Sequence, residues 1–403
     1  MKIHIVKQGE NTADIAKKYG ISERILKIAN EIDEKYGIIE GEELLILTPT
    51  RTYTAKAGDD LVRVALRFGQ PAGALRGLNP HIITDQIPEG ETVIVKFDER
   101  PYGMGTANGV YYKGCPKWKL MRALPFLTYL TVGSIIFDGK KLSSTFNNGE
   151  IVGIATEAGK VPLLRIYDKS NGEIYYDKKT RDEYIDRLMQ SALEEGYRGL
   201  TLAGENYDNE GYEEFLVELR GKMIGNDMIL MSEITPESPI GISDFSDGAI
   251  LSCDGICDED ALINFAKDGE STKTLIEIPV FAFCENGDVM ETRDAIDIAK
   301  RTNTPICHDT TTNKSCFFNK NYGRINFDSL SYIKSRMDNL ANLGYMGISF
   351  DIGRTPLSYL MMYDALFKSV GYANVDKRVR CNPYTTKNQH IEESSYITED
   401  SIR

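Results

Sequence analysis

The stretch GYRGLTLAGEN, residues 196–206, has the pattern of a buried strand that ends in a single acid, Glu205. Because side chains alternate along a strand, Thr201, Ala203 and Glu205 are expected on one face. The stretch therefore predicts a strand that carries one carboxylate at its C-terminal end.

The segments around this strand alternate between strand and helix patterns. Helical patterns flank it at residues 180–195 and 212–222. Eight strands are expected in all, at residues 109–112, 127–137, 161–167, 199–203, 228–232, 248–253, 274–281 and 347–350. This order favours an α/β fold of the (β/α)8 TIM-barrel type. In such a barrel the C-terminal ends of the strands carry the chemistry, so Glu205 is expected at the functional end.

Composition limits the class of protein. The chain has 403 residues, 41% hydrophobic and 27% charged, which is ordinary for a globular protein. No apolar run approaches about 18 residues, so no membrane span is expected. The start, MKIHIVKQGE, lacks the apolar core of a signal peptide, which predicts cytoplasmic synthesis without an export signal. A net charge of -13 argues against a nucleic-acid partner.

Cysteines and histidines give no strong metal signal. The seven cysteines are odd in number and scattered, as expected for reduced thiols. Cys253 and Cys257 are spaced like half of a metal site, but no second Cys/His pair at ligand spacing accompanies them. Structural thiols are therefore favoured over a metal site, and no cofactor is expected. The four histidines lie far apart and are expected to be surface or packing residues.

The first hundred residues contain an internal repeat. Four positions recur exactly 49 residues later: Gly9, Gly20, Asn30 and Gly41 return as Gly58, Gly69, Asn79 and Gly90. A fixed register of this kind marks two copies of one small module, expected at residues 1–48 and 51–97. Each copy has the pattern strand, helix, helix, strand, and Asn11 and Ser22 are the expected helix caps of the first copy.

Both copies resemble the LysM family. The second copy carries YTAKAGDDLVRVALRFG, LRGLNP and IPEGETVIV, and the first carries IHIVKQGENTADIAKKYG, ILKIAN and IIEGEELLIL. The resemblance implies two small βααβ modules that bind N-acetylglucosamine-containing glycans such as peptidoglycan or chitin. The alternative is that the two modules only mediate protein contacts.

The resemblance also implies a glycan groove between the first and the last loop of each module. Its positions in this sequence are Gly9, Glu10, Asn11, Thr12, Asn30, Glu31 and Ile32 in the first module, and Gly58, Asp59, Asp60, Asn79, Pro80 and His81 in the second. The asparagines are expected to fold the loops more than to touch sugar.

Three segments of the remaining chain resemble family-18 glycoside hydrolases. WKLMRALPFLTYLTVGSIIFDG, LIEIPVFAF and LANLGYMGISFDIGR are similar to the second, seventh and eighth strands of the spore-associated bacterial members, which also carry two LysM modules. The resemblance runs in order over most of residues 102–370. It implies a barrel at residues 102–375, joined by a short connector at residues 99–105. A segment inserted at about residues 285–324 and a polar tail at residues 376–403 complete the expected domain plan.

The predicted catalytic strand departs from the family pattern. The family's fourth strand carries the motif D-G-x-D-x-D-x-E, whose acids fall on Arg198, Thr201, Ala203 and Glu205. The resemblance implies Glu205 as general acid while the substrate's own N-acetyl oxygen attacks the anomeric carbon. The aspartate expected at position 203 would orient that acetamide, stabilise the cationic intermediate and tune the acid. Alanine supplies none of these functions. Arg198 could pair with a nearby acid as a structural substitute.

Two further family positions are also changed. Ser252 and Asp254 stand where the family has Met-x-Tyr, and Asp351 stands where it has a tryptophan that stacks under the sugar. Three losses in one mechanism predict a glycan-binding protein whose hydrolysis is impaired or absent, with Glu205 as a residual acid.

Other functions stay open at this stage. One alternative is an active spore cortex-lytic N-acetylglucosaminidase that uses Glu205, and another is a structural spore-coat protein with protein partners. A third is a carboxylate cluster that binds a cation or an amino sugar at the barrel mouth, against which stands a solvated acidic rim; its members would be Asp168, Glu205, Glu233, Asp254 and Asp351. Association with the spore is implied by the resemblance alone.

Overall fold

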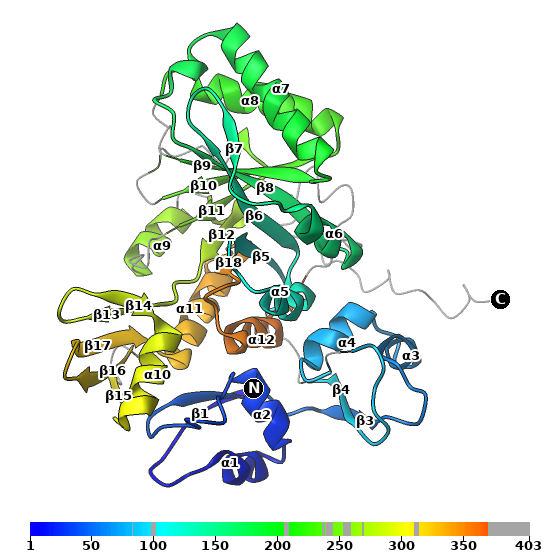
Figure 1. The fold of residues 1–403 in the computed structure, drawn as a ribbon, viewed down its shortest axis with the longest axis vertical. Helices are drawn as coiled ribbons and strands as arrows, with labels where there is room; N and C mark the ends of the chain where they lie inside the picture. The colour runs from blue at the N-terminus through cyan, green and yellow to red at the C-terminus, as the bar shows by residue number, and fades with distance from the viewer. Residues whose placement is uncertain are drawn as a thin grey trace.

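A computed structural model describes residues 1–82, 84–97, 102–204, 209–235, 238, 245–252, 259–267, 270–309 and 314–369 (Figure 1). The predicted site residues Glu205 and Asp254 lie outside these residues, as do the half-site cysteines Cys253 and Cys257. In the part of the chain that is described, no helix combines the length and the apolarity needed to cross a bilayer.

The two N-terminal modules have the predicted strand–helix–helix–strand order. The elements of the first are β1 (Lys2–Ile5), α1 (Thr12–Tyr19), α2 (Glu23–Ala29) and β2 (Glu43–Ile46). Those of the second are β3 (Arg51–Thr54), α3 (Leu61–Arg67), α4 (Ala72–Leu78) and β4 (Thr92–Lys96). In each module the two strands pair antiparallel, and the helices pack on one side of them.

Helix capping in the first module follows the sequence in part. Asn11 caps α1 as predicted, because its Oδ1 accepts a hydrogen bond from the backbone N–H of Asp14 at 2.9 Å. Ser22 stands at the start of α2, but its side chain makes no capping hydrogen bond, so that prediction is wrong for the hydroxyl group.

The large domain is a closed barrel of eight parallel strands, as predicted. Its strands, in order around the barrel, are β5 (Met104–Tyr112), β18 (Gly347–Asp351), β12 (Thr274–Glu277), β11 (Gly248–Leu251), β10 (Ile229–Ile234), β9 (Gly199–Gly204), β8 (Val161–Asp168) and β6 (Tyr129–Phe137). Pairing of β5 with β6 closes the ring. Two short strands, β7 (Leu142–Ser144) and β19 (Lys368–Ser369), extend its edges.

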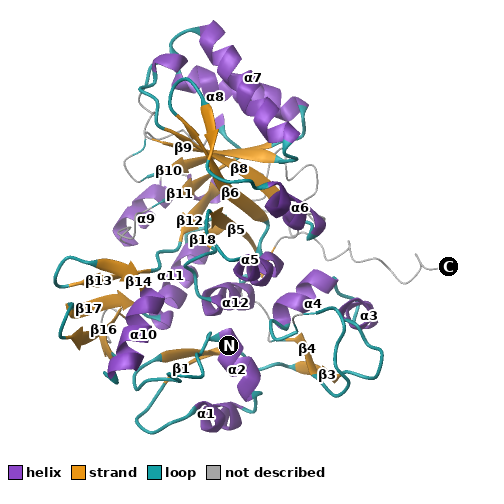
Figure 2. Ribbon diagram, viewed as in Figure 1, coloured by secondary structure: helices purple, strands orange, loops and turns teal. Residues whose placement is uncertain are grey.

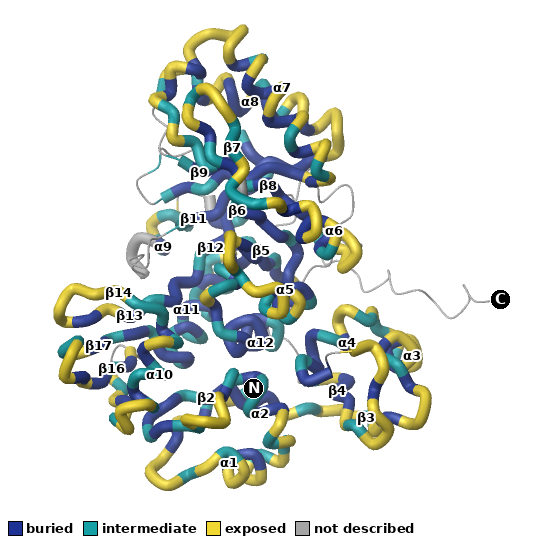
Figure 3. Tube along the Cα trace, viewed as in Figure 1, coloured by how far each residue is buried: buried dark blue, intermediate teal, exposed yellow. Residues whose placement is uncertain are grey.

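Helices surround the barrel on its outer side (Figure 2). They are α5 (Lys117–Ala123), α6 (Gly149–Glu157), α7 (Lys178–Glu194), α8 (Tyr212–Gly225), α9 (Glu259–Lys267), α11 (Leu330–Asn342) and α12 (Leu357–Leu366). Alternation along the strands sends one set of side chains to these helices and the other into the barrel. The tube in Figure 3 is accordingly buried along most of the strands, whereas α7 and α8 have exposed stretches and α12 is mostly buried.

The inside of the barrel changes character along its axis. An apolar layer near the strand starts contains Leu163, Met231 and Leu275 among others. Above it, Thr131 and Thr201 are fully buried and lie 3.4 Å apart at their hydroxyl oxygens. The charged side chains of Arg165 and Glu233 lie toward the C-terminal strand ends, which form the polar mouth of the barrel.

The predicted seventh strand, residues 274–281, is divided in the structure. β12 ends at Glu277, and β13 (Phe281–Cys284) belongs to a separate sheet. Pro279 lies between them, and proline has no N–H to continue a ladder. The separate sheet has the order β14 (Val289–Glu291), β13, β17 (Gly323–Asp328), β16 (Lys314–Asn319) and β15 (Cys307–Asp309), and α10 (Thr292–Thr302) packs on one face of it. This sheet and helix are called the inserted subdomain below.

The first LysM-type module is docked against the rest of the molecule. Ala29, Leu45 and Leu47 belong to the same apolar core as the barrel helices. The module lies beside α12 and the inserted subdomain (Figure 1). The second module contacts the first through a small apolar cluster formed by Ile25, Leu78 and Ile94.

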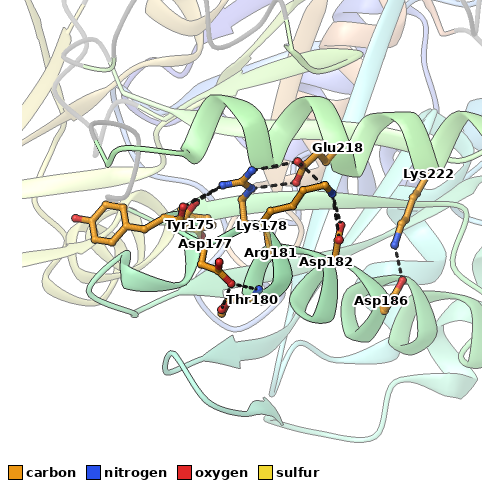
Figure 4. Close-up of polar contacts among 10 residues, drawn as sticks. Tyr175, Asp177, Lys178, Thr180, Arg181, Asp182, Asp186, Glu218 and Lys222 are labelled. Carbon is orange, nitrogen blue, oxygen red and sulfur yellow. Dashed lines mark hydrogen bonds and ion pairs between the residues drawn. The ribbon is translucent and has the colours of Figure 1, made fainter.

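The helices before and after β9 are held together by charged contacts (Figure 4). Arg181 on α7 donates two hydrogen bonds to the Glu218 carboxylate on α8, at 3.0 and 3.1 Å, and a third to the carbonyl of Tyr175 at 2.7 Å. The Arg181 side chain is only 10% exposed, so this pair is a packed element of the interface. It fixes the two helices that precede and follow β9.

Candidate functional site

Strand β9 supplies the first group of predicted site positions. Thr201 is completely buried and Ala203 is 5% exposed, and both face the barrel interior. The strand ends at Gly204, directly before Glu205. The inner face of β9 therefore carries a hydroxyl and a methyl group at two positions where the family resemblance expects acids.

A salt bridge lies in front of these positions. Arg165 on β8 donates from Nε and Nη2 to the two carboxylate oxygens of Glu233 on β10, both at 2.6 Å. β9 runs between β8 and β10, and its Thr201 is in register with Arg165 on one side and with Met231 on the other. Since Glu233 is two residues beyond Met231, the ion pair crosses the inner face of β9 at the level of Thr201 and Ala203.

The Arg165–Glu233 pair is well packed. The two side chains are 16% and 15% exposed. The guanidinium carbon lies 5.4 Å from the ring centre of Tyr167 and 5.8 Å from that of Tyr112. Burial alone would lower the pKa of Arg165, but the Glu233 carboxylate more than offsets this and raises the pKa above its ordinary value. The opposite charges of Arg165 and Glu233 thus compensate each other at the mouth.

Around this pair the mouth opens into a cavity of about 550 Å³. Ser252 and Asp351, two of the predicted positions, both line it, so the structure brings them together. Ser252 donates a hydrogen bond from Oγ to Glu277 at 2.5 Å. The cavity thus presents short polar and charged groups where the family resemblance expects a methionine and a tryptophan.

Asp351 is occupied in shaping a turn. One of its carboxylate oxygens accepts hydrogen bonds from the backbone N–H groups of Gly353 and Arg354, at 2.8 and 3.3 Å. Burial raises the pKa of Asp351, and the guanidinium of Arg354 partly offsets that shift. This side chain cannot stack on a sugar face as an indole does.

Cys115 also lines the cavity, but it is a poor nucleophile. Burial raises the pKa of its thiol to about 11, so at neutral pH the sulfur stays protonated. Covalent catalysis through Cys115 is therefore disfavoured.

The predicted acidic residues do not gather into a cation site among the residues that the structure describes. Glu233 is paired with Arg165, and Asp168 accepts hydrogen bonds from the Ser170 N–H at 2.7 Å and from the Tyr175 hydroxyl. Within the same residues, no group of three His, Cys, Asp or Glu side chains is placed to hold a metal ion. These two acids are thus used by the protein itself.

Arg198 lies away from the mouth. It precedes β9 at the N-terminal end of the strand and is exposed to solvent. None of the acids in the described ranges forms an ion pair with it, so the expected structural substitute is not found there.

In the first module, the predicted groove residues mostly hold the fold. The Asn30 amide bonds to the carbonyls of Leu26 and Leu45 and to the N–H of Leu45. Thr12 donates to Glu23 at 2.6 Å, and Asn11 caps α1. Gly9 is exposed and has a φ of 79°.

Glu31 in the same module is turned toward the large domain. Its carboxylate lies 3.3 Å from the Arg293 guanidinium and accepts a hydrogen bond from the Leu357 N–H at 3.3 Å. Its side chain is only 11% exposed. A groove at this end of the first module would therefore have to share Glu31 with the docking interface.

The second module repeats this use of the predicted residues. Asn79 is fully buried and bonds to the backbone of Leu75 and Ile94. Asp59 accepts from the Tyr53 hydroxyl at 2.6 Å, and Asp60 caps α3. Two groove positions leave surface free: Gly58 is exposed and Pro80 is half-buried.

The sequence interpretation missed the centre of the mouth. Arg165 was not singled out, although VPLLRIYD places a charged side chain on the inward face of an apolar strand. A buried arginine requires a carboxylate partner, and that requirement was the available signal. Its partner, Glu233, was considered only as a member of an acidic cluster.

Comparisons with known proteins agree with this architecture. The LysM domain model matches residues 4–46 and 53–96. The Bacillus subtilis (strain 168) protein described as "Putative sporulation-specific glycosylase YdhD" is 23% identical over 245 residues, 57% of this chain and 57% of that protein. Cell wall-binding protein YocH of the same strain is 34% identical over 107 residues, 26% of this chain and 37% of that protein. The chain thus spans less than two thirds of each of these relatives.

Solved structures extend the likeness to the whole fold. The spore cortex-lytic enzyme SleL of Bacillus megaterium QM B1551 matches with a TM-score of 0.69 and 18% identity, over 92% of this chain and 98% of that chain. The class V chitinase of Nicotiana tobaccum matches with a TM-score of 0.56 and 12% identity, over 65% of this chain and 99% of that chain. At these identities the likeness concerns the fold. The chain carries two LysM domains followed by a barrel with the fold of the cortex-lytic enzyme SleL and of class V chitinase.

Proposed function

We propose that this protein binds N-acetylglucosamine-containing glycans of the cell wall and that its barrel does not hydrolyse them by the family-18 mechanism. Two LysM domains support the first part, together with the similarity of 107 residues of this chain to cell wall-binding protein YocH. The spore setting of YdhD and SleL supports the spore wall as the place of binding.

The observation that carries the second part is the salt bridge across β9. In the family mechanism a carboxylate two residues before the acid faces a cationic intermediate. Here that position is Ala203, and the neighbouring carboxylate, Glu233, is already bonded twice to Arg165. A neutral pair stabilises a developing positive charge far less than a free carboxylate does. Glu205 would therefore protonate a leaving group without the partner that makes the step productive.

Changes in the rest of the mouth point in the same direction. Ser252 stands at the methionine of the family's Met-x-Tyr and Asp351 at its stacking indole, and both are bonded within the protein. In the sequence, Asp254 takes the place of the tyrosine that binds the acetamide. The cavity of about 550 Å³ remains large enough for a sugar unit, so it is proposed as a binding pocket.

Within the LysM domains, the glycan is proposed to lie along the exposed turns at Gly9 and Gly58. The side chains of Asn30 and Asn79 hold those loops in place from behind. Their role in binding is then indirect, through the shape of the groove.

Co-sedimentation of the full chain with insoluble peptidoglycan and with chitin tests the binding. We expect the protein in both pellets, and we expect soluble chito-oligosaccharides to release it. Cello-oligosaccharides, which have the same linkage but lack the N-acetyl group, are the matched control and should not release it. Protein that stays in the supernatant with both polymers would contradict the proposal and favour a structural role through protein contacts.

A further inference from the structure

Two cysteines of the inserted subdomain lie opposite each other. β15 and β16 pair antiparallel, and their register places Cys307 directly against Cys316. Directly opposed residues point to the same face of a sheet, with their Cβ atoms about 5 Å apart. Cys307 is exposed, Cys316 is half-buried, and both are free thiols in the structure. Nothing in the proposed glycan site uses this pair.

The geometry of this pair permits a covalent link. Opposed Cα atoms in an antiparallel pair are about 4.5 or 5.5 Å apart, depending on the hydrogen-bonding position. Both values fall within the range of about 4.4–6.8 Å found for disulfides. We propose that Cys307 and Cys316 are a redox pair that closes to a disulfide on exposure to a low-molecular-weight disulfide.

The chemistry is two successive thiol–disulfide exchanges. The more exposed Cys307 attacks the small disulfide, forms a mixed disulfide and releases one small thiol. Cys316 then attacks the Cys307 sulfur and releases the second small thiol. The protein loses two thiol protons and two electrons, and the small disulfide takes up both. Arg324 lies with its Nη2 3.3 Å from the Cys316 sulfur, which puts a positive charge beside the second nucleophile.

The disulfide would secure the joint between this subdomain and the first LysM domain. Ile306, directly before β15, donates from its N–H to the Glu40 carbonyl at 2.9 Å. His308 donates from Nε2 to the Gly41 carbonyl at 2.5 Å and accepts at Nδ1 from the Ser315 hydroxyl at 2.9 Å. β15 has three residues and lies at the sheet edge. A covalent link to β16 therefore holds the short strand that contacts the LysM domain.

Peptide mapping tests the pair. The reduced full chain is incubated with bis(2-hydroxyethyl) disulfide, its remaining thiols are alkylated, and it is digested with trypsin. Cleavage after Arg301, Lys314 and Lys320 puts Cys307 and Cys316 in separate peptides, residues 302–314 and 315–320. We expect these two peptides to be joined, and to separate on reduction. Mixed disulfides on both cysteines without a joined peptide would overturn the proposal.

Hydrogen exchange tests the consequence for the joint. On oxidation we expect amide exchange in residues 306–309 and 40–43 to slow on the order of tenfold. Cys307→Ser should abolish this change, whereas Cys284→Ser, at a buried cysteine of β13, should leave it intact. Unchanged exchange in a protein shown to carry the disulfide would overturn the proposed link to the LysM domain.

Discussion

At the residue scale, the methyl group of Ala203 leaves the inner face of β9 clear for the Arg165–Glu233 pair. Ala203 is buried on the strand between β8 and β10, which carry the two charged residues. A carboxylate at this position would place a second anion beside Glu233 and would compete for Arg165. Ala203 is therefore compatible with the Arg165–Glu233 salt bridge, whereas an acid at position 203 would disturb it.

Restoring a single catalytic position should not restore hydrolysis. In Ala203→Asp we expect no release of reducing ends from chito-oligosaccharides, because Asp254 and Asp351 still stand at the positions of the acetamide-binding tyrosine and the stacking tryptophan. The added carboxylate is also expected to be drawn into the Arg165 site. A large gain in reducing ends from this one substitution, lost again when Glu205→Gln is added, would show that the other changes matter little.

Replacing both partners of the salt bridge should lower the stability by less than the sum of the two single replacements. Arg165→Met or Glu233→Leu leaves one partner in a site where the native side chains are 16% and 15% exposed, and each should lower the unfolding free energy by about 3 kcal/mol. The double variant Arg165→Met/Glu233→Leu should lose clearly less than the sum. Chemical denaturation measures all three proteins. Strict additivity would mean that the two charges do not interact.

For individual residues, the sequence predicted which side chains face the barrel interior better than it predicted which side chains contact each other. Alternation correctly placed Thr201 and Ala203 inside the barrel. It did not reveal that Arg165 and Glu233, 68 residues apart, would meet across β9. Nor did the scattered cysteines suggest a pair, because the contact of Cys307 with Cys316 depends on strand register. Such contacts depend on which strands pair and in which register, and a local sequence pattern does not contain this information.

At the scale of elements, the strand pattern predicted the barrel, although the first strand begins at Met104 rather than at residue 109 and the seventh ends before residue 281. The run at residues 274–281 looked like one strand because it is apolar almost throughout. Pro279 ends the barrel pairing, and the chain then enters the inserted subdomain with β13. Apolar runs thus predicted where the strands lie. The end of β12 could be predicted only from Pro279, which has no backbone N–H to donate.

The half-buried Lys160, directly before β8, predicts how the unfolding free energy depends on pH. Its ammonium donates to the Leu127 carbonyl at 2.7 Å, and burial lowers its pKa from 10.5 to about 8. Between these two values the unfolded chain binds more protons than the native protein, so native stability rises with pH. Relative to Lys160→Met, the unfolding free energy should rise by up to about 3 kcal/mol from pH 8 to 10.5. Parallel pH profiles for the two proteins would contradict this assignment.

At the scale of the whole molecule, the first LysM domain is a fixed part of the structure. Lys300 and Glu42 form an ion pair of 2.8 Å across the joint, with side chains 4% and 6% exposed. Glu43 accepts hydrogen bonds from the N–H and hydroxyl groups of Ser331, at 2.7 and 2.8 Å. The sequence predicted the modules from their repeat but left their docking open, because Gly41 and Glu42 at the joint have identical counterparts, Gly90 and Glu91, in the second module.

The internal repeat supplies a matched pair of variants for this joint. Gly41 and Gly90 are equivalent, with φ values of 82° and 86°. A Cβ on Gly41 would lie 1.9 Å from the Ile306 carbonyl oxygen, whereas one on Gly90 would meet nothing within 4 Å. Both alanine variants carry a left-handed backbone cost of about 1–2 kcal/mol.

Only Gly41→Ala should therefore separate the LysM domain from the inserted subdomain. Small-angle scattering is expected to show a larger radius of gyration for Gly41→Ala and an unchanged one for Gly90→Ala. Equal radii for both variants and the native protein would mean that the Gly41 contact does not hold the joint.

The central claim is that this protein holds cell-wall glycan without cutting it, and one measurement addresses it most directly. Purified full chain is incubated with spore peptidoglycan, and bound protein and new reducing ends are measured in the same sample over time. The account predicts protein in the pellet and a reducing-end signal equal to that of Glu205→Gln. Reducing ends that accumulate with the native protein and disappear with Glu205→Gln would contradict it.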